Sequence, residues 1–140
     1  MSAEFFIDTN ILVYSFDETE PEKRVRSRAL IARALSEGTG VISWQVVQEF
    51  LNVALHRWKS PMSEGDARRF IDSTLQPLCQ IYPDSLLWTS ALQLRTQSGY
   101  RWYDSLVLAS ALRAGCRTLY SEDLQDGRSF GNLLIRNPYF

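Results

Sequence analysis

Short apolar runs alternate with longer amphipathic segments along the whole chain. Each apolar run is short and is bounded by polar or glycine-containing turns, as expected of buried strands. These runs cover residues 5–7, 40–43, 79–82, 116–121 and 133–136. Alternating strands and helices favour right-handed βαβ units, which bury a parallel sheet between two helical layers. We therefore expect an α/β fold, a three-layer α/β/α sandwich around a parallel sheet of about five strands.

The segments between these runs carry apolar residues at helical spacing and recognisable helix ends. Pro21 suits the first turn of a helix, whereas Gly38 and Gly115 suit the residue that follows a last turn. Ser63 and Asp66 begin another helix with a pattern similar to a capping box. The predicted helices cover residues 11–16, 19–37, 44–57, 63–77, 85–99 and 103–114.

Composition limits both the class of protein and the chemistry that it can carry. The 140 residues are 45% hydrophobic and 22% charged, which excludes disorder, collagen and coiled coil and favours a single domain over residues 1–140. Cys79 and Cys116 are too few for a disulfide framework, and His56 is the one histidine. The formal net charge of −1 does not by itself indicate a nucleic-acid binder. Any chemistry must therefore come from carboxylates, hydroxyls or basic groups.

Neither a secretory signal nor a membrane-spanning segment is expected. The N-terminal residues lack a basic stretch followed by a long apolar run. No apolar stretch approaches the roughly 18 residues that a membrane span needs. We therefore expect a cytoplasmic protein in a reducing environment, with no membrane partner.

Carboxylates follow two of the predicted strands. Asp8 comes directly after residues 5–7, and Asp123 follows residues 116–121. Ligands of parallel sheets bind beyond the carboxyl ends of the strands, so both acids are expected at the same edge. Carboxylates that converge there would repel one another unless a cation were present. Oxygen ligands suit Mg²⁺ or Mn²⁺, which would favour metal-assisted hydrolysis of a phosphate ester.

Each acid also has a purely structural interpretation. Asp8 could cap the short helix that follows it, and Asp104 could complement the dipole at the start of its helix. Asp126 and Gly127 form a common turn pair. Glu49 could be a solvated residue on a polar helix face. The residues alone leave both interpretations open.

Four motifs in order give the chain a family resemblance. Residues 6–14 (FIDTNILVY) resemble the opening motif of PIN-domain ribonucleases, and residues 43–50 (SWQVVQEF) resemble their second motif, which supplies a glutamate. Residues 102–106 (WYDSL) are similar to the third, an aspartate that begins an apolar helix. Residues 119–124 (LYSEDL) are similar to the fourth, in which Ser or Thr stands two residues before an aspartate. The final residues, 137–140 (NPYF), resemble the C-terminal motif of many members.

The resemblance implies a Mg²⁺- or Mn²⁺-dependent endoribonuclease. It is strongest to the VapC-type toxins of toxin–antitoxin modules. Such proteins cleave structured RNA such as tRNA, are usually homodimers, and are silenced by a separately encoded antitoxin. The resemblance therefore predicts RNA as substrate, an antitoxin partner and a homodimer.

Carried over by position, the resemblance also assigns the site. It makes Asp8, Glu49, Asp104 and Asp123 the catalytic and metal-binding acids. Asp8 and Asp104 would bind the metal directly, Asp123 directly or through water, and Glu49 would hold the metal or orient the attacking water. Asp126 matches an extra acid of some members.

Other polar residues would support these acids or the RNA. Thr9, Asn10 and Ser121 would hydrogen-bond the acids or the phosphate. Arg101 is a candidate for a contact to the RNA backbone, and Trp102 could shape the groove.

Other functions fit the same pattern less well. A PIN nuclease that processes RNA without an antitoxin would have the same motifs. A non-catalytic RNA- or protein-binding module would be expected to lose acids, but all four positions are acidic here. A phosphatase of small substrates would need a loop of backbone donors around one phosphate, and the scattered glycines do not form one.

Overall fold

Strand β1 (Phe5–Ile7) lies in the middle of the sheet because all three of its side chains are apolar and fully buried. Its neighbours are β2 (Gly40–Ser43) and β4 (Thr118–Tyr120), both parallel to it. A strand buried on both faces must be apolar throughout, as the run Phe-Phe-Ile is. The carboxyl ends of these three parallel strands therefore meet at one edge of the sheet.

The computed structural model describes residues 3–140. Its sheet has six strands in the order β3-β2-β1-β4-β6-β5. Strands β3 (Cys79–Ile81) and β6 (Leu133–Arg136) extend the parallel pairing on either side. Strand β5 (Ser129–Phe130) pairs with β6 in the antiparallel direction and forms the edge. The expected parallel sheet is confirmed, with this short antiparallel strand added.

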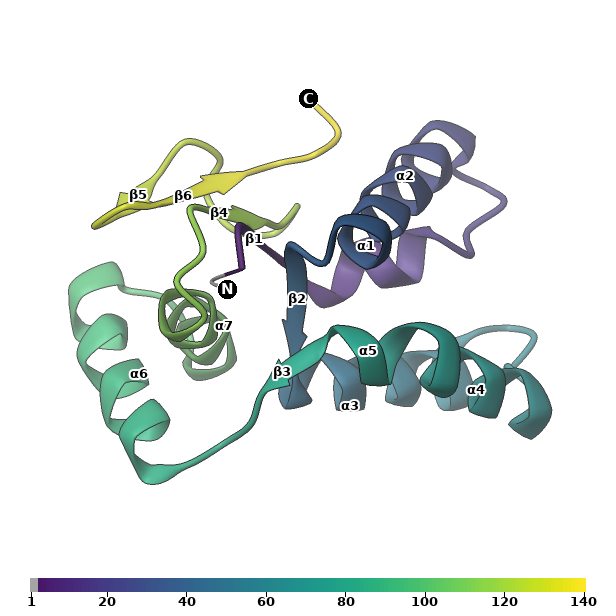
Figure 1. Ribbon diagram of the computed structural model, residues 1–140, viewed down its shortest axis with the longest axis horizontal. Helices are drawn as coiled ribbons and strands as arrows, with labels where there is room; N and C mark the ends of the chain where they lie inside the picture. Colours follow the sequence, from purple (N-terminus) through teal and green to yellow (C-terminus); the bar gives the residue numbers. More distant parts are fainter. Residues whose placement is uncertain (1–2) are drawn as a thin grey trace.

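Helices cover both faces of the sheet, which confirms the expected α/β/α sandwich. In Figure 1, α6 (Ser85–Ser98) and α7 (Trp102–Arg113) lie side by side on one face. The helices on the other face are α1 (Thr9–Tyr14), α2 (Pro21–Glu37), α3 (Trp44–Asn52), α4 (Glu64–Phe70) and α5 (Gln76–Leu78). None of the helices within residues 3–140 has both the length and the apolar character needed to cross a bilayer.

Two predicted helices are interrupted by wider, π-helical turns. The helix expected over residues 44–57 is α3 followed by η1 (Val53–Arg57). The helix expected over residues 63–77 is α4, then η2 (Ile71–Leu75), then α5. Apolar periodicity does not distinguish these turns from ordinary α-helix, because each adds a single residue to one turn.

Gly40 allows α2 to approach the first two strands closely. A Cβ atom on this residue would lie 2.4 Å from Ala34 Cβ and 2.6 Å from the ring of Phe5. No side chain larger than hydrogen fits there without displacing its neighbours.

The two cysteines are free: Cys79 is half-buried and Cys116 is buried.

Candidate active site

Asp8 follows β1 directly and is buried at the edge where the parallel strands end. Its backbone is extended, and it precedes the first residue of α1. Oδ1 accepts a hydrogen bond of 2.8 Å from the backbone N–H of Thr9, and Oδ2 accepts one of 2.8 Å from Ser121 Oγ. Asp8 thus caps α1, as the structural interpretation expected. The same carboxylate is also held by Ser121, the residue that follows β4. It lies at the edge of the sheet where the catalytic interpretation requires it.

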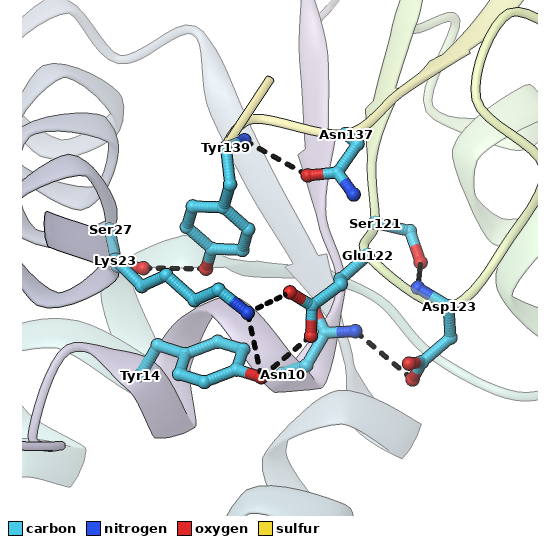
Figure 2. Close-up of polar contacts among 9 residues, drawn as sticks. All are labelled: Asn10, Tyr14, Lys23, Ser27, Ser121, Glu122, Asp123, Asn137 and Tyr139. Carbon is cyan, nitrogen blue, oxygen red and sulfur yellow. Dashed lines mark hydrogen bonds and ion pairs between the residues drawn. The ribbon is translucent and has the colours of Figure 1, made fainter. Parts of the chain in front are cut away.

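The segment after β4 brings Asp123 to the same edge. Ser121 Oγ accepts hydrogen bonds of 3.3 Å from Asp123 N–H and 3.4 Å from Leu124 N–H, while it donates to Asp8. Asn10 Nδ2 donates a bond of 3.0 Å to Asp123 Oδ2 (Figure 2). Ser121 and Asn10 therefore connect two acids that are 115 positions apart in the sequence.

Glu49 reaches the site from α3, which Ser43 caps by accepting a hydrogen bond of 3.3 Å from Val46 N–H. Glu49 Oε1 accepts hydrogen bonds from Thr9 Oγ1 at 3.2 Å and from Gln45 Nε2 at 3.1 Å. Because Thr9 immediately follows Asp8, its hydroxyl connects the β1 edge to α3. Thr9, Asn10 and Ser121 each hydrogen-bond one of the predicted acids.

Asp104 lies in the first turn of α7, where a carboxylate complements the partial positive charge of the helix end. The backbone carbonyl of Tyr103, its neighbour, accepts a hydrogen bond of 3.2 Å from Gln45 Nε2. Gln45 therefore bonds both Glu49 and the start of α7. This contact crosses between the two helical layers at the edge of the sheet.

The four acids form a closed ring of electrostatic contacts. Burial raises the pKa of Asp8 to about 6, hydrogen bonds from Ser121 and Thr9 oppose this rise, and the charges of Glu49 and Asp123 add to it. Burial raises the pKa of Glu49, and the charge of Asp104 adds to that effect. Burial also raises the pKa of Asp104, with a further rise from Asp123 and an opposing effect of Arg101. The charges of neighbouring acids thus add to the raised pKa of Asp8, Glu49 and Asp104, and a bound cation would oppose that effect.

The donor chemistry of this ring fits a hard divalent cation. Its ligand atoms are carboxylate oxygens, and the buried Oδ1 of Asn10 has no hydrogen-bond partner. As the side chains lie, however, no three Asp, Glu, His or Cys residues within 3–140 are gathered into a shell that could hold a metal. Direct ligation by three or more of the acids would therefore require their side chains to move closer together.

Asp126 is separate from this ring. It is exposed, and its Oδ1 accepts a hydrogen bond of 2.8 Å from the backbone N–H of Asn137. It fixes the chain after β6 to the turn before β5, so the extra acidic position is explained by a structural contact. Arg101 is exposed and Trp102 is half-buried, both next to Asp104. Their predicted contacts to RNA remain predictions.

Two residues at the site were not predicted to act there. Gln45 lies four residues before Glu49 on α3, a spacing that could have indicated the hydrogen bond between them. Glu122 contacts Lys23 and Tyr14, which are 99 and 108 positions away. No local pattern in the sequence indicates such distant partners.

The sequence of this chain matches a family model as well. The model for the PIN domain matches residues 5–125, which contain all four acids of the ring. The chain belongs to the PIN domain family. In this PIN domain, β5, β6 and the C-terminal residues lie beyond the matched region. No curated protein matches it by sequence.

Several solved structures share the fold at low sequence identity. A toxin–antitoxin complex from Klebsiella pneumoniae contains a chain with a TM-score of 0.70 and 19% identity, covering 99% of this chain and 98% of that one. The FitAB structure bound to an IR36 DNA fragment gives a TM-score of 0.70 and 16% identity, covering 97% and 96%. VapBC2 from Rickettsia felis, bound to a promoter DNA fragment, gives 0.65 and 20%, covering 95% and 97%. At these identities the likeness establishes the fold.

Proposed function

We propose that this PIN domain is a metal-dependent endoribonuclease. The observation that carries the proposal is the set of Asp8, Glu49, Asp104 and Asp123, whose charges act on one another at the edge of the sheet where β1, α3, α7 and the segment after β4 meet. Mutual repulsion among these carboxylates serves no evident structural purpose, because uncharged polar residues could cap the same helices. Repulsion between carboxylates lowers the stability of the folded protein, and such a loss is typical of a site that binds a cation.

Mg²⁺, with Mn²⁺ as a substitute, is the proposed cofactor. When bound, it would supply a water of lowered pKa and stabilise charge on the phosphate. Asp8 and Asp104 would hold it, with Asp123 and Glu49 completing the set or orienting water. Thr9, Ser121 and Gln45 keep these carboxylates in place through the hydrogen bonds described above. The chain's own task is thus to hold charged acids at fixed positions near the scissile phosphate.

We further propose that the nuclease is the toxin of a toxin–antitoxin pair. Support comes from the fold, since the Klebsiella pneumoniae and Rickettsia felis structures are a toxin–antitoxin complex and a VapBC2 complex that match nearly the full length of this chain. An antitoxin protein is accordingly the proposed partner, structured RNA such as tRNA the proposed substrate, and a homodimer the proposed assembly. A PIN nuclease that acts without an antitoxin is the alternative.

Incubation of the purified protein with total tRNA tests the nuclease. Discrete fragments are expected with Mn²⁺ or Mg²⁺, and EDTA is expected to abolish them. Asp104→Asn keeps the size of the side chain but removes its charge, so it should abolish cleavage while the protein stays folded. Asp126→Asn is the matched control, because Asp126 is an exposed aspartate outside the ring whose Oδ1 acceptor the asparagine retains.

Equal cleavage by the Asp104→Asn variant and the wild type would refute the proposed site. Cleavage that requires Zn²⁺ would contradict the argument from oxygen ligands. Expression in growing cells separates toxin from processing enzyme. A toxin arrests growth unless its antitoxin is present, and the arrest should disappear in the Asp104→Asn variant.

A further inference from the structure

A polar cluster of Tyr14, Lys23 and Glu122 lies next to the acid ring, and none of its three members was assigned a role in the site. Figure 2 shows the three side chains pointing toward one another from α1, α2 and the segment after β4. Lys23 Nζ donates to Glu122 Oε2 at 2.5 Å, and Tyr14 Oη donates to Glu122 Oε1 at 2.6 Å. Lys23 Nζ is also 3.4 Å from Tyr14 Oη. Both oxygens of Glu122 are therefore engaged, and its rotamer is fixed.

The cluster attaches the Asp123 segment to α1 at a third point. Ser121 contacts Asp8 at the start of α1, and Asp123 contacts Asn10 in the first turn. Glu122 contacts Tyr14, which is four residues beyond Asn10 on the same helix. Three consecutive residues thus bond to α1 or its N-cap at three separate points. Because Glu122 and Asp123 are adjacent in the chain, a shift of the backbone at Glu122 also moves Asp123.

The C-terminal residues cover this cluster. Tyr139 packs edge-to-face on Tyr14, with ring centroids 5.4 Å apart, and Lys23 Nζ lies 5.4 Å from the centre of the Tyr139 ring. Tyr139 Oη and Ser27 Oγ share a hydrogen bond of 2.7 Å. Arg26 Nη1 donates to the carbonyl of Pro138 at 3.3 Å. The end of the chain is therefore held over the Lys23–Glu122 pair by α2.

We infer that Lys23 and Glu122 are positioning residues, which hold the 121–123 segment so that the Asp123 carboxylate faces Asp8 and Asn10. The inference rests on the proposed nuclease function. It adds two residues that are not themselves among the proposed metal-binding acids. A surface ion pair of this kind contributes little to stability when it is exposed. Here the pair joins α2 to the loop of a proposed catalytic acid, so its effect should appear in geometry.

Breaking the pair tests the inference. Lys23→Met and Glu122→Gln each remove one charge while keeping most of the side chain's length. We expect kcat to fall about 10- to 100-fold, as for residues that support ligating groups, with KM unchanged. Lys23→Arg should keep most of the activity because it retains a donor and a charge. The exchange of both charges, Lys23→Glu with Glu122→Lys, should recover part of the loss.

Arg113→Met is the matched control. It breaks the ion pair of Arg113 with Asp84, which joins the last turn of α7 to the N-cap of α6 at 2.8 Å and lies outside the hydrogen-bond network of the acids. A purely structural role predicts that all three variants lower the melting temperature and kcat alike. A positioning role predicts that only the Lys23 and Glu122 variants lower kcat. Equal kcat in wild type, Lys23→Met and Glu122→Gln would overturn the inference.

A readout without RNA separates this inference from the proposed function. The side-chain amide of Asn10 donates to Asp123, so its NMR resonance in the metal-free, isotope-labelled protein would report on that contact. Its chemical shift should change in Glu122→Gln and stay unchanged in Arg113→Met. If the wild type cleaves no RNA, the proposed function fails, yet a changed Asn10 signal would still support the positioning role. An unchanged Asn10 signal would overturn it, whatever the cleavage assay gives.

Discussion

The hydroxyl of Ser121 donates a hydrogen bond of 2.8 Å to the buried carboxylate of Asp8, across 113 positions of sequence. Asp8 immediately follows β1 and Ser121 immediately follows β4, and these two strands pair in parallel. The parallel pairing of β1 with β4 therefore sets the geometry of the site. Changes that disturb this pairing should affect the acids before they affect the rest of the fold.

The stability of the metal-free protein should decrease as pH rises, because of Asp8. The folded-state pKa of about 6 exceeds the ordinary value of 3.8, so the folded protein binds this proton more tightly than the unfolded chain does. The stabilisation is present below about pH 4 and is lost as pH rises to about 6, at a cost of about 3 kcal/mol. Denaturant unfolding in EDTA at several pH values measures it.

Asp8→Asn should remove most of this pH dependence. The amide oxygen can still accept from Thr9 N–H, and no charge is left in the buried position. The variant should be more stable than the wild type at neutral pH, and the two should converge in acid. A variant that is less stable at neutral pH would show that burial of the Asp8 charge is not costly.

Mn²⁺ should stabilise the wild type against heat because it binds the folded ring and not the unfolded chain. At 100 times its dissociation constant, a ligand of this kind adds about 2.7 kcal/mol. EDTA should reverse the shift. Differential scanning fluorimetry with and without Mn²⁺ measures it, and Asp104→Asn should greatly reduce the shift. A shift of equal size in Asp104→Asn would place the ion elsewhere.

Thr9→Val should weaken catalysis by about tenfold with little effect on folding. Burial raises the pKa of Glu49, and the hydroxyl of Thr9 opposes that rise through a hydrogen bond of 3.2 Å. Without it, the pKa of Glu49 should rise further, and the lower arm of the pH–rate profile should move to higher pH. Thr19→Val, which removes an exposed hydroxyl bonded to Asp17, is the control. An identical profile in both variants would argue against a role for Thr9.

Gly40→Ala and Gly65→Ala should change stability in opposite directions. At Gly40 the new methyl group would overlap Ala34 and Phe5, so we expect a loss of about 3 kcal/mol. At Gly65, within α4, the nearest atoms are 3.7 Å away on the flexible Arg69 side chain. Alanine there should stabilise by up to about 1 kcal/mol, because glycine disfavours helix. Urea unfolding of both variants checks this, and a stable Gly40→Ala would mean that α2 can move away.

The parallel core and the helix order could be predicted from the sequence because β1 and its neighbours are apolar throughout. Strand β5 could not, since two residues, Ser129 and Phe130, carry no periodicity. They pair only because the turn at Gly131, in the left-handed region at φ 59°, returns the chain to β6. The π-helical turns were missed for the reason given above.

At the site, the convergence of Asp8 and Asp123 followed from strand ends, whereas the families' motifs supplied Glu49 and Asp104. The role of Asp126 could not be read from the sequence, because its partner is the backbone of Asn137 and backbone donors leave no sequence signal. The contacts of Glu122 could not be predicted either, because its partners are distant in the sequence. Its partners come from α1 and α2, and only the folded chain brings them near.

The central position of β1 also affects when the proposed site can be assembled during synthesis of the chain. Strand β1 is synthesised more than 110 residues before β4, so both of its sides can be paired only after that interval. Until then Ser121 is not available to Asp8, and Asp123 has not been added to the chain. A partly made chain therefore holds Asp8 and Glu49 without their partners. A chain that ends before residue 121 would therefore lack two parts of the proposed site, the Ser121 hydroxyl and the Asp123 carboxylate.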